Sequence, residues 1–216
     1  SRFPETEEGQ DFQSLNYNQK VYFHRLGTPQ SEDELVYETP QFKEQGHGLG
    51  VTDDGRWAFI SSSTGTDNRN ELRVIDLANR ADGSWQTRDI VTGFENEWSP
   101  IASTGDTVYF MTNTDAPRYR IVRADLTQPT LEWEEVIPQG DDPISGASII
   151  GDKLVVEFMQ DASSRAVYYD LDGNRTGELD LPGIGSIAGF GGEPGDSETF
   201  YSFTSFNQPG AIYRLD

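Results

Sequence analysis

Residues 105–112 read GDTVYFMT, and this stretch holds the two signals that decide the fold. The Gly-Asp pair marks a tight turn, because glycine reaches backbone conformations that other residues avoid. The run after it is rich in β-branched and aromatic residues, which is typical of a β-strand. The same order returns at 151–158, where the chain reads GDKLVVEF. The pattern indicates a repeating unit of turn and strand.

The repeat has a regular period. Turn aspartates recur at steps of 52, 46 and 44 residues, at Asp54, Asp106, Asp152 and Asp196. Leucines that close a later strand recur at steps of 49, 45 and 44 residues, at Leu77, Leu126, Leu171 and Leu215. Two independent landmarks thus share a period of about 45–50 residues, which fits a four-stranded β-propeller blade.

The period predicts the domain organisation. Four strands of about five residues, with their turns, use up one such length. We predict an all-β protein, a β-propeller whose blades are four-stranded antiparallel sheets. About five blades are expected, and the first and last are incomplete, so we expect a fragment of a longer propeller. The expected blades are residues 1–39, 40–93, 94–139, 140–183 and 184–216.

Short apolar runs bounded by Gly, Asp, Asn or Pro locate the strands, and helical periodicity is missing. Besides a short strand at 2–3, strands are predicted at 20–25, 35–38, 48–52, 57–61, 72–76, 87–91, 98–103, 108–112, 120–124, 133–137, 145–150, 153–158, 166–170, 186–190, 199–203 and 211–215. The expected core is formed by bulky side chains of the middle strands, namely Trp57, Phe59, Tyr109, Phe110, Phe158, Phe200 and Phe203.

The charge balance excludes several classes of protein. The 216 residues include 37 acidic and 16 basic side chains, for a formal net charge of -21. Such a chain repels the phosphates of nucleic acids and of anionic membranes. Cysteine is absent, which excludes disulfides, thiolate nucleophiles and cysteine zinc sites. No apolar run approaches the length of a membrane span. We expect a soluble bacterial protein of the cytoplasm or periplasm.

Several segments resemble the prolyl oligopeptidase family of serine peptidases. The similarity covers nearly the whole chain in order, and its segments are specific. They read LNYNQKVYFHRLGTPQSED at 15–33, GHGLGVTDDGRW at 46–57, GTDNRNELRVIDL at 65–77, TNTDAPRYRIVRADL at 112–126 and YSFTSFNQPGAIYRLD at 201–216.

The resemblance implies a function for the chain as part of a larger enzyme. It implies a piece of a seven-bladed propeller, from within the third blade to within the seventh. Such a propeller is not catalytic; it caps an α/β-hydrolase domain and helps to restrict access to short peptides. The resembled parent is a serine endopeptidase that cleaves after proline. The catalytic domain is the expected partner, no cofactor is expected, and this chain is expected to be inactive alone.

The residues themselves give no sign of a hydrolase site. A nucleophile elbow needs glycines two residues before and after a serine. Ser186 in GIGSIAG comes nearest, but Ile184 occupies the first glycine position, so a strand entry explains the run better. Only two histidines could act as a base. His24 is expected to pack, partly buried, in a strand, and His47 is expected either to face the central channel or to lie in a plain loop.

A metal site is not expected either. Asp170, Asp172 and Asn174 have the opening spacing of a calcium loop, since alternate oxygen ligands can converge on one ion. Arg175 and Leu181 occupy the positions where such a loop needs glycine and glutamate. A hairpin turn explains the segment better.

One loop can be assigned a role from the resemblance. The segment TGTDNRN at 64–70 corresponds to a family loop that faces the large cavity and helps to line distal substrate subsites. Thr66, Asp67 and Arg69, together with His47, are therefore the candidate substrate-contact residues of the assembled enzyme. The competing interpretation is an interstrand loop held by Asx-type turns.

Two other functions stay open at this point. An isolated or engineered propeller fragment would expose strand edges, which invite self-association. A ligand-binding propeller is a weaker alternative, with Trp57, Trp85, Trp98 and Trp133 as a sugar platform. Tryptophan in alternating strands belongs more often to a core than to a platform.

Overall fold

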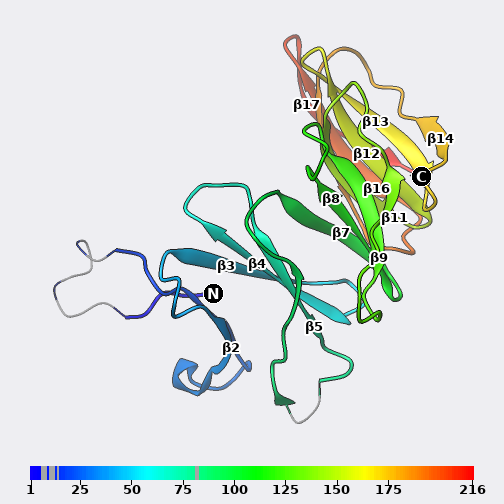
Figure 1. Ribbon diagram of the computed structural model, residues 1–216. Coiled ribbons are helices and arrows are strands. Elements are labelled where there is room, and N and C mark those ends of the chain that lie inside the picture. The colour runs from blue at the N-terminus through cyan, green and yellow to red at the C-terminus, as the bar shows by residue number, and fades with distance from the viewer. Residues whose placement is uncertain (6–8, 10–12, 14, 81–82) are drawn as a thin grey trace. The chain divides into compact units, whose positions relative to one another are not determined.

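A computed structural model describes residues 1–5, 9, 13, 15–80 and 83–216 (Figure 1). Its described strands form five antiparallel sheets, and its one described helical element is the 3-10 turn η1 (Gln30–Glu32). The all-β prediction is confirmed. None of the described helices is long and apolar enough to cross a membrane. The chain divides into two compact units, Ser1–Trp98 and Ser99–Asp216, which are described separately.

The first unit contains two sheets. Sheet A pairs β1 (Lys20–Phe23) with β2 (Glu34–Glu38), and the backbone of Arg2 bridges to Lys20. Sheet B is an up-and-down sheet of β3 (Gln45–Val51), β4 (Trp57–Thr64), β5 (Glu71–Asp76) and β6 (Arg88–Val91). The two sheets share a buried cluster of Val21, Val36, Ala58, Ile60 and Ile75.

The second unit contains three sheets, coloured from green to red in Figure 1. Sheet C comprises β7 (Trp98–Thr104), β8 (Thr107–Thr112), β9 (Arg120–Asp125) and β10 (Glu134–Ile137). Sheet D comprises β11 (Ile144–Ile150), β12 (Lys153–Gln160), β13 (Ser163–Asp170) and β14 (Arg175–Glu178). Sheet E comprises β15 (Ser186–Gly191), β16 (Thr199–Ser205) and β17 (Gln208–Leu215).

The register of the sheets reproduces the repeat in the sequence. In sheets B, C and D, the first residue of the second strand pairs with the aspartate just before a landmark leucine: Trp57 with Asp76, Thr107 with Asp125, and Lys153 with Asp170. In sheet E, Thr199 pairs with the landmark Leu215 itself. The turn glycines all have positive φ: 71° at Gly55, 66° at Gly105, 59° at Gly151 and 113° at Gly195. Both landmarks therefore mark equivalent points of sheets B, C and D, and sheet E differs by one residue in its register.

Apolar clusters join neighbouring sheets of the second unit. Tyr109 and Ile121 of sheet C share a cluster with Leu154 and Val156 of sheet D. Val155 and Ala166, on the other face of sheet D, share a cluster with Phe203 of sheet E. Because strand side chains alternate between faces, the middle strands β12 and β13 of sheet D each contribute to both clusters.

The predicted core is correct except at one position. Trp57, Phe59, Tyr109, Phe110, Phe158 and Phe203 are buried. Phe200 is 51% exposed, so its prediction as a core residue is wrong. Thr199, Tyr201 and Phe203 occupy the buried face of β16, and strand alternation turns Phe200 to the opposite face.

Candidate functional site

The loop at 64–70 joins β4 to β5 at one end of sheet B. Asp67 forms an Asx-type turn, because its carboxylate accepts a hydrogen bond from the backbone N–H of Arg69 at 3.0 Å. The same carboxylate accepts hydrogen bonds from the guanidinium of Arg69, including 3.0 Å bonds from Nε to both oxygens. These bonds from Arg69 lower the pKa of Asp67 to about 2. Thr66 beside them is exposed.

A buried asparagine fixes the far end of this loop. The Asn70 side chain donates to Ser61 Oγ and to the Trp98 carbonyl, each at 2.9 Å, and accepts from the Trp98 N–H at 2.8 Å. Asn70 is therefore a positioning residue for the loop. Sequence reasoning did not single it out, because asparagine in a polar loop gives no signal of burial.

His47 is buried inside the first unit. It lies in β3 and is 4% exposed. Its Nδ1 lies 2.9 Å from Ser62 Oγ, its Nε2 lies 3.1 Å from Thr39 Oγ1, and its backbone N–H donates to Gln19 Oε1 at 2.5 Å. Both ring nitrogens are thus occupied, and the ring does not lie at the surface beside Asp67.

His24 differs from the sequence expectation. It lies just after β1 rather than within a strand, and its side chain is 43% exposed, so the prediction of a partly buried packing residue is wrong. Its Nδ1 lies 2.7 Å from Asp33 Oδ1, and Asp33 also accepts a 2.9 Å bond from Arg2. The contact with Asp33 keeps the His24 ring in a polar, exposed environment instead of the alternating strand that the sequence predicts.

In the described part of the chain, neither histidine contacts both a serine and a carboxylate, as the base of a hydrolytic triad would. His47 contacts a serine, whereas His24 contacts a carboxylate. Ser62 is completely buried, so no substrate carbonyl can reach its hydroxyl. Ser186 is simply the exposed first residue of β15 and pairs with Thr204. The expected strand entry at Ser186 is confirmed.

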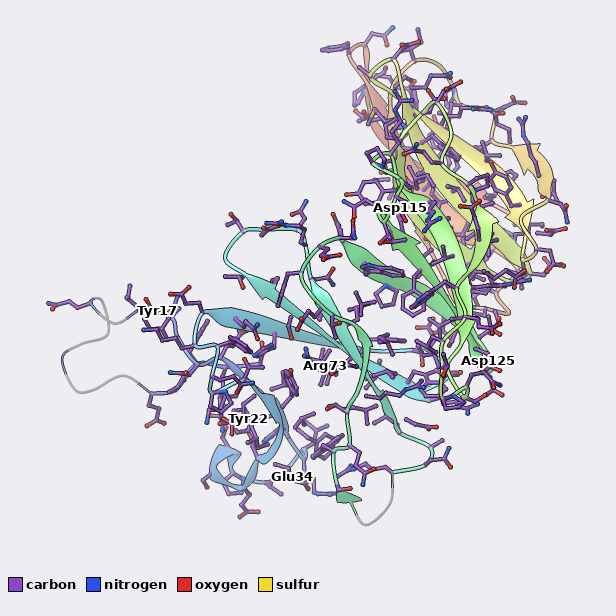
Figure 2. The ribbon with its side chains drawn as sticks, in the orientation of Figure 1. Tyr17, Tyr22, Glu34, Arg73, Asp115 and Asp125 are labelled. Carbon is purple, nitrogen blue, oxygen red and sulfur yellow. The ribbon has the colours of Figure 1, made fainter. Side chains whose placement is uncertain are left out.

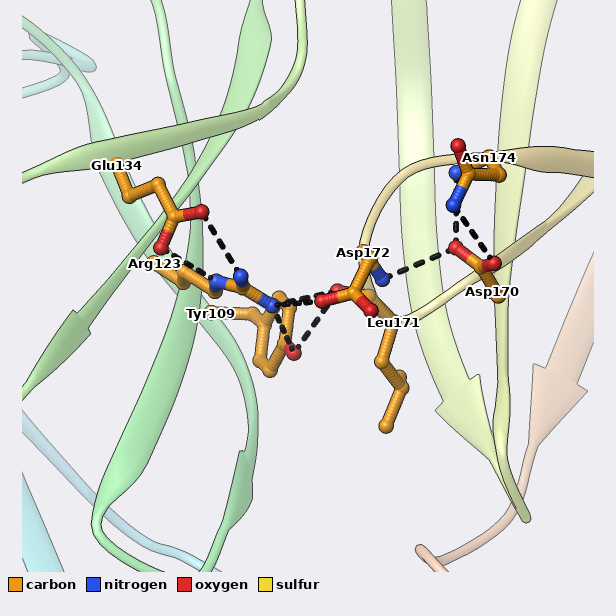
Figure 3. Close-up of polar contacts among 7 residues, drawn as sticks. All are labelled: Tyr109, Arg123, Glu134, Asp170, Leu171, Asp172 and Asn174. Atoms are coloured by element: carbon orange, nitrogen blue, oxygen red, sulfur yellow. Dashed lines mark hydrogen bonds and ion pairs between the residues drawn. The ribbon is translucent and has the colours of Figure 1, made fainter.

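The segment at 170–174 is a hairpin turn, as predicted (Figure 3). The Asp170 carboxylate accepts bonds from the backbone N–H groups of Asp172 at 3.0 Å and Asn174 at 2.8 Å. The amide of Asn174 donates to it at 2.9 Å. In the described part of the chain, no three His, Asp or Glu side chains gather as they would around a metal ion.

This turn is held against sheet C by Arg123 of β9 (Figure 3). Arg123 Nη1 donates to the Leu171 carbonyl and to Asp172 Oδ1, each at 2.9 Å. Its Nε and Nη2 donate to the two oxygens of Glu134 at 2.9 and 2.8 Å. The bonds to Glu134 contribute most to raising the pKa of Arg123. Tyr109 Oη also donates to the Leu171 carbonyl, at 3.1 Å.

The four tryptophans all pack against other side chains. Trp57 and Trp98 are buried. The Trp85 ring lies 5.4 Å from that of Phe23 and is covered by the Arg80 guanidinium at 3.5 Å. Trp133 meets Phe110 edge to face at 5.3 Å. These contacts favour core packing over an open sugar platform.

Comparison with known proteins assigns the family. The model of the "Prolyl oligopeptidase, N-terminal beta-propeller domain" matches residues 1–216. The prolyl endopeptidases of Elizabethkingia meningoseptica and Elizabethkingia miricola are each 35% identical to this chain over its full length. The chain spans 30% of the length of each of these relatives.

Solved structures show the same fold. One, from a structural and mechanistic analysis of two prolyl endopeptidases, is 39% identical, covers 94% of this chain and 30% of its own chain, and superposes with a TM-score of 0.87. Prolyl oligopeptidase B from Galerina marginata, solved with a macrocyclization substrate, is 24% identical, covers 100% of this chain and 30% of its own, and gives a TM-score of 0.91. The predicted β-propeller class is confirmed. The chain therefore belongs to the family of prolyl oligopeptidase N-terminal β-propeller domains.

Proposed function

We propose that this chain is the substrate-gating part of the β-propeller of a serine endopeptidase that cleaves after proline. It acts together with an α/β-hydrolase catalytic domain, which is its partner, and contributes no catalytic residue itself. The observation that carries this proposal is the match of all 216 residues to a family whose named relatives are prolyl endopeptidases. The bacterial source of these two relatives supports a bacterial enzyme, for which we propose the cytoplasm or periplasm.

The separated histidine contacts support a non-catalytic role. Nucleophilic hydrolysis needs a serine, a base and an orienting carboxylate in one continuous arrangement. His47 contacts the serine and His24 contacts the carboxylate, so no described histidine joins all three groups. In this proposal the chemistry belongs to the partner domain.

The loop at 64–70 is the proposed peptide-contact element. Thr66, Asp67 and Arg69 are exposed at the end of sheet B, where a peptide can approach. The closed Asp67–Arg69 pair offers both a cation and an anion without a net charge, which suits the polar backbone of an extended peptide. His47 supports this loop through Ser62 and does not itself present a free nitrogen.

The test uses the Elizabethkingia meningoseptica enzyme with its matching segment replaced by these 216 residues. We expect the double variant Asp67→Asn with Arg69→Gln to raise KM for proline-containing peptides several-fold, with kcat nearly unchanged, because it removes binding and not chemistry. The matched control is Asp152→Asn in the exposed β11–β12 turn. Equal KM values for the double variant, the control and the parent chimaera would reject the contact role.

A second candidate function is self-assembly through open strand edges. Sheet E has three described strands where sheets B, C and D have four, so β17 has one edge without a described partner. An unpaired edge is a template for another strand. Sedimentation of the purified chain separates the two candidates. Concentration-dependent dimers would favour self-assembly, and a monomer at all concentrations would exclude it.

A further inference from the structure

A layer of buried polar groups lies between sheets A and B, around His47. Thr39 follows β2, Ser62 belongs to β4, and both hydroxyls contact the imidazole, at 3.1 and 2.9 Å. The edge of the Tyr37 ring meets the imidazole with ring centroids 5.1 Å apart. Gln19, before β1, accepts the backbone N–H of His47. The His47 side chain therefore connects β3 to β4 and to the residue after β2, and its backbone N–H connects β3 to the segment before β1.

The same residue stands next to the loop at 64–70. His47 pairs with Ser62 in the β3–β4 ladder, and Gln45 pairs with Thr64, the first residue of the loop. Gln45 is also buried, and its Oε1 has no hydrogen-bond partner. Any displacement of His47 is therefore transmitted both to sheet A and to the start of the loop.

The charges around His47 disfavour its protonation. Arg73 of β5 (Figure 2) is the cation whose charge acts on His47, and its guanidinium lies 5.2 Å from the Tyr37 ring. Its own carboxylate partners, Glu71 at 3.1 Å and Asp89 at 2.7 Å, lie on Arg73 rather than on the imidazole. On the side of sheet A, the charges next in sequence to Gln19 and Thr39 are Lys20 and Glu38, which pair with each other at 2.7 Å.

We propose that His47 is an acid-sensitive latch: as the neutral imidazole it holds sheet A and the start of the loop at 64–70 against sheet B, and when protonated it releases them. A neutral ring donates one hydrogen bond and accepts another, which matches two hydroxyl partners. A protonated ring must donate from both nitrogens, so one hydroxyl has to turn. The added charge also stands in a buried layer, where no described carboxylate contacts the ring and the charge of Arg73 opposes it.

The direction of the pH effect follows from burial. Burial lowers the pKa of His47 below its ordinary value of 6.5, and Arg73 lowers it further. Below pH 6.5, the unfolded chain binds a proton at this histidine before the folded chain does. The contribution of neutral His47 to the free energy of unfolding is therefore fully present above pH 6.5. It decreases as the pH drops toward the lowered pKa. Within that window, the unfolding equilibrium constant rises by up to about tenfold per pH unit.

The experiment measures urea unfolding of the protein between pH 8 and pH 5. The wild-type protein is compared with His47→Gln and with His24→Gln, which changes the other of the two histidines and is the matched control. We expect the unfolding constant of the wild type and of His24→Gln to rise on acidification more steeply than that of His47→Gln. The same pH dependence in the wild type and in His47→Gln would overturn the proposal.

A second measurement covers the case in which His47→Gln does not fold. The His24→Gln variant retains a single histidine, so its imidazole resonance in an NMR titration is assigned without ambiguity. We expect a midpoint below pH 6.5, with backbone amides of β2 and of residues 62–66 shifting at the same midpoint. A midpoint at or above pH 6.5, or amides in β2 that do not respond, would overturn the proposal.

Discussion

Besides their shared apolar clusters, sheets A and B are connected by neutral polar groups, whereas sheets C and D are connected by a charged guanidinium. His47 is enclosed by two hydroxyls and an aromatic edge. Arg123 has two carboxylates, a backbone carbonyl and a phenol as partners, and its side chain keeps 21% exposure. The charge of Arg123 is stable between sheets C and D because two of its partners are carboxylates and water reaches the guanidinium.

The difference predicts the conditions that weaken each contact between sheets, which we call the A–B joint around His47 and the C–D joint around Arg123. The A–B joint depends on a ring staying neutral, so mild acid weakens it. The C–D joint depends on carboxylates staying ionised and on close backbone packing, so it fails only in stronger acid or when its geometry is altered. The two joints thus resist different conditions within one repeat architecture.

The largest effect is expected from Gly173→Ala at the C–D joint. Gly173 has a φ of +85°, and an added Cβ would lie 2.1 Å from the Val136 carbonyl oxygen of β10. The clash forces the turn away from sheet C, so we expect a loss of more than about 3 kcal/mol in the free energy of unfolding. The control is Gly105→Ala, with φ +66° and nothing within 4 Å, where about 1–2 kcal/mol of backbone strain is expected. Equal losses in urea unfolding would contradict close packing at Gly173.

A smaller loss is expected from Arg123→Ala. The variant leaves the Leu171 carbonyl with only Tyr109 and removes the ion pairs, so we expect a loss of about 2 kcal/mol at pH 7. Arg123 lowers the pKa of Glu134 below its ordinary value of 4.5. The pair's contribution is therefore present above pH 4.5 and disappears as the pH falls through the lowered pKa. A difference between variant and wild type that narrows in acid, measured by urea unfolding, supports the assignment; a constant difference down to pH 2 would contradict it.

A gain in stability is expected from Glu157→Gln in β12. Burial raises the pKa of Glu157, and no described residue forms a hydrogen bond or ion pair with it. Its charge is thus unfavourable at neutral pH, and an uncharged isostere should add about 0.5–1 kcal/mol to the free energy of unfolding at pH 7. The gain should shrink as the pH falls and the carboxyl takes up a proton. A loss of stability at pH 7 would indicate a partner for this carboxylate.

The smallest effect on stability is expected from Arg69→Gln. We expect the pKa of Asp67 to rise from about 2 toward its ordinary value of 3.8, because the guanidinium bonds disappear. Melting temperature should stay nearly unchanged, since the pair is exposed. Carboxyl NMR reports the titration, and Asp170 is the internal control because its pKa is lowered by Asn174 instead. A simultaneous rise at Asp170 would indicate a change in fold rather than loss of the pair.

Strand positions were largely predictable from the sequence, because strands in this chain alternate and end at glycine turns. The exception is β14, which reads RTGE and was not predicted. This strand is short and contains no apolar residue, so it lacks the alternation of apolar and polar residues from which a strand is predicted. Its pairing with β13 is fixed instead by the turn at Asp170 and by the Arg165–Glu178 contact at 2.5 Å.

Polar side chains were predictable only where their partners are local. The turn at Asp170 was expected, and an Asx turn in the loop at 64–70 was one of two interpretations, because each partner lies within a few residues. Arg123 and Asn70 were missed, since their partners lie up to 49 and 28 residues away. The environment of His24 was misjudged for the same reason: Asp33 reaches it across a loop. The contact roles of Thr66, Asp67, Arg69 and His47 stay predictions.

Size selectivity tests the central claim that this propeller limits access to a catalytic domain. The measurement is the ratio of kcat/KM for a short proline-containing peptide to that for a long one, in the Elizabethkingia meningoseptica chimaera. We predict a strong preference for the short peptide, and a lower ratio when Arg123→Ala loosens the joint between sheets C and D. A chimaera that cleaves both substrates equally well, with the same ratio in the variant, would contradict the gating function.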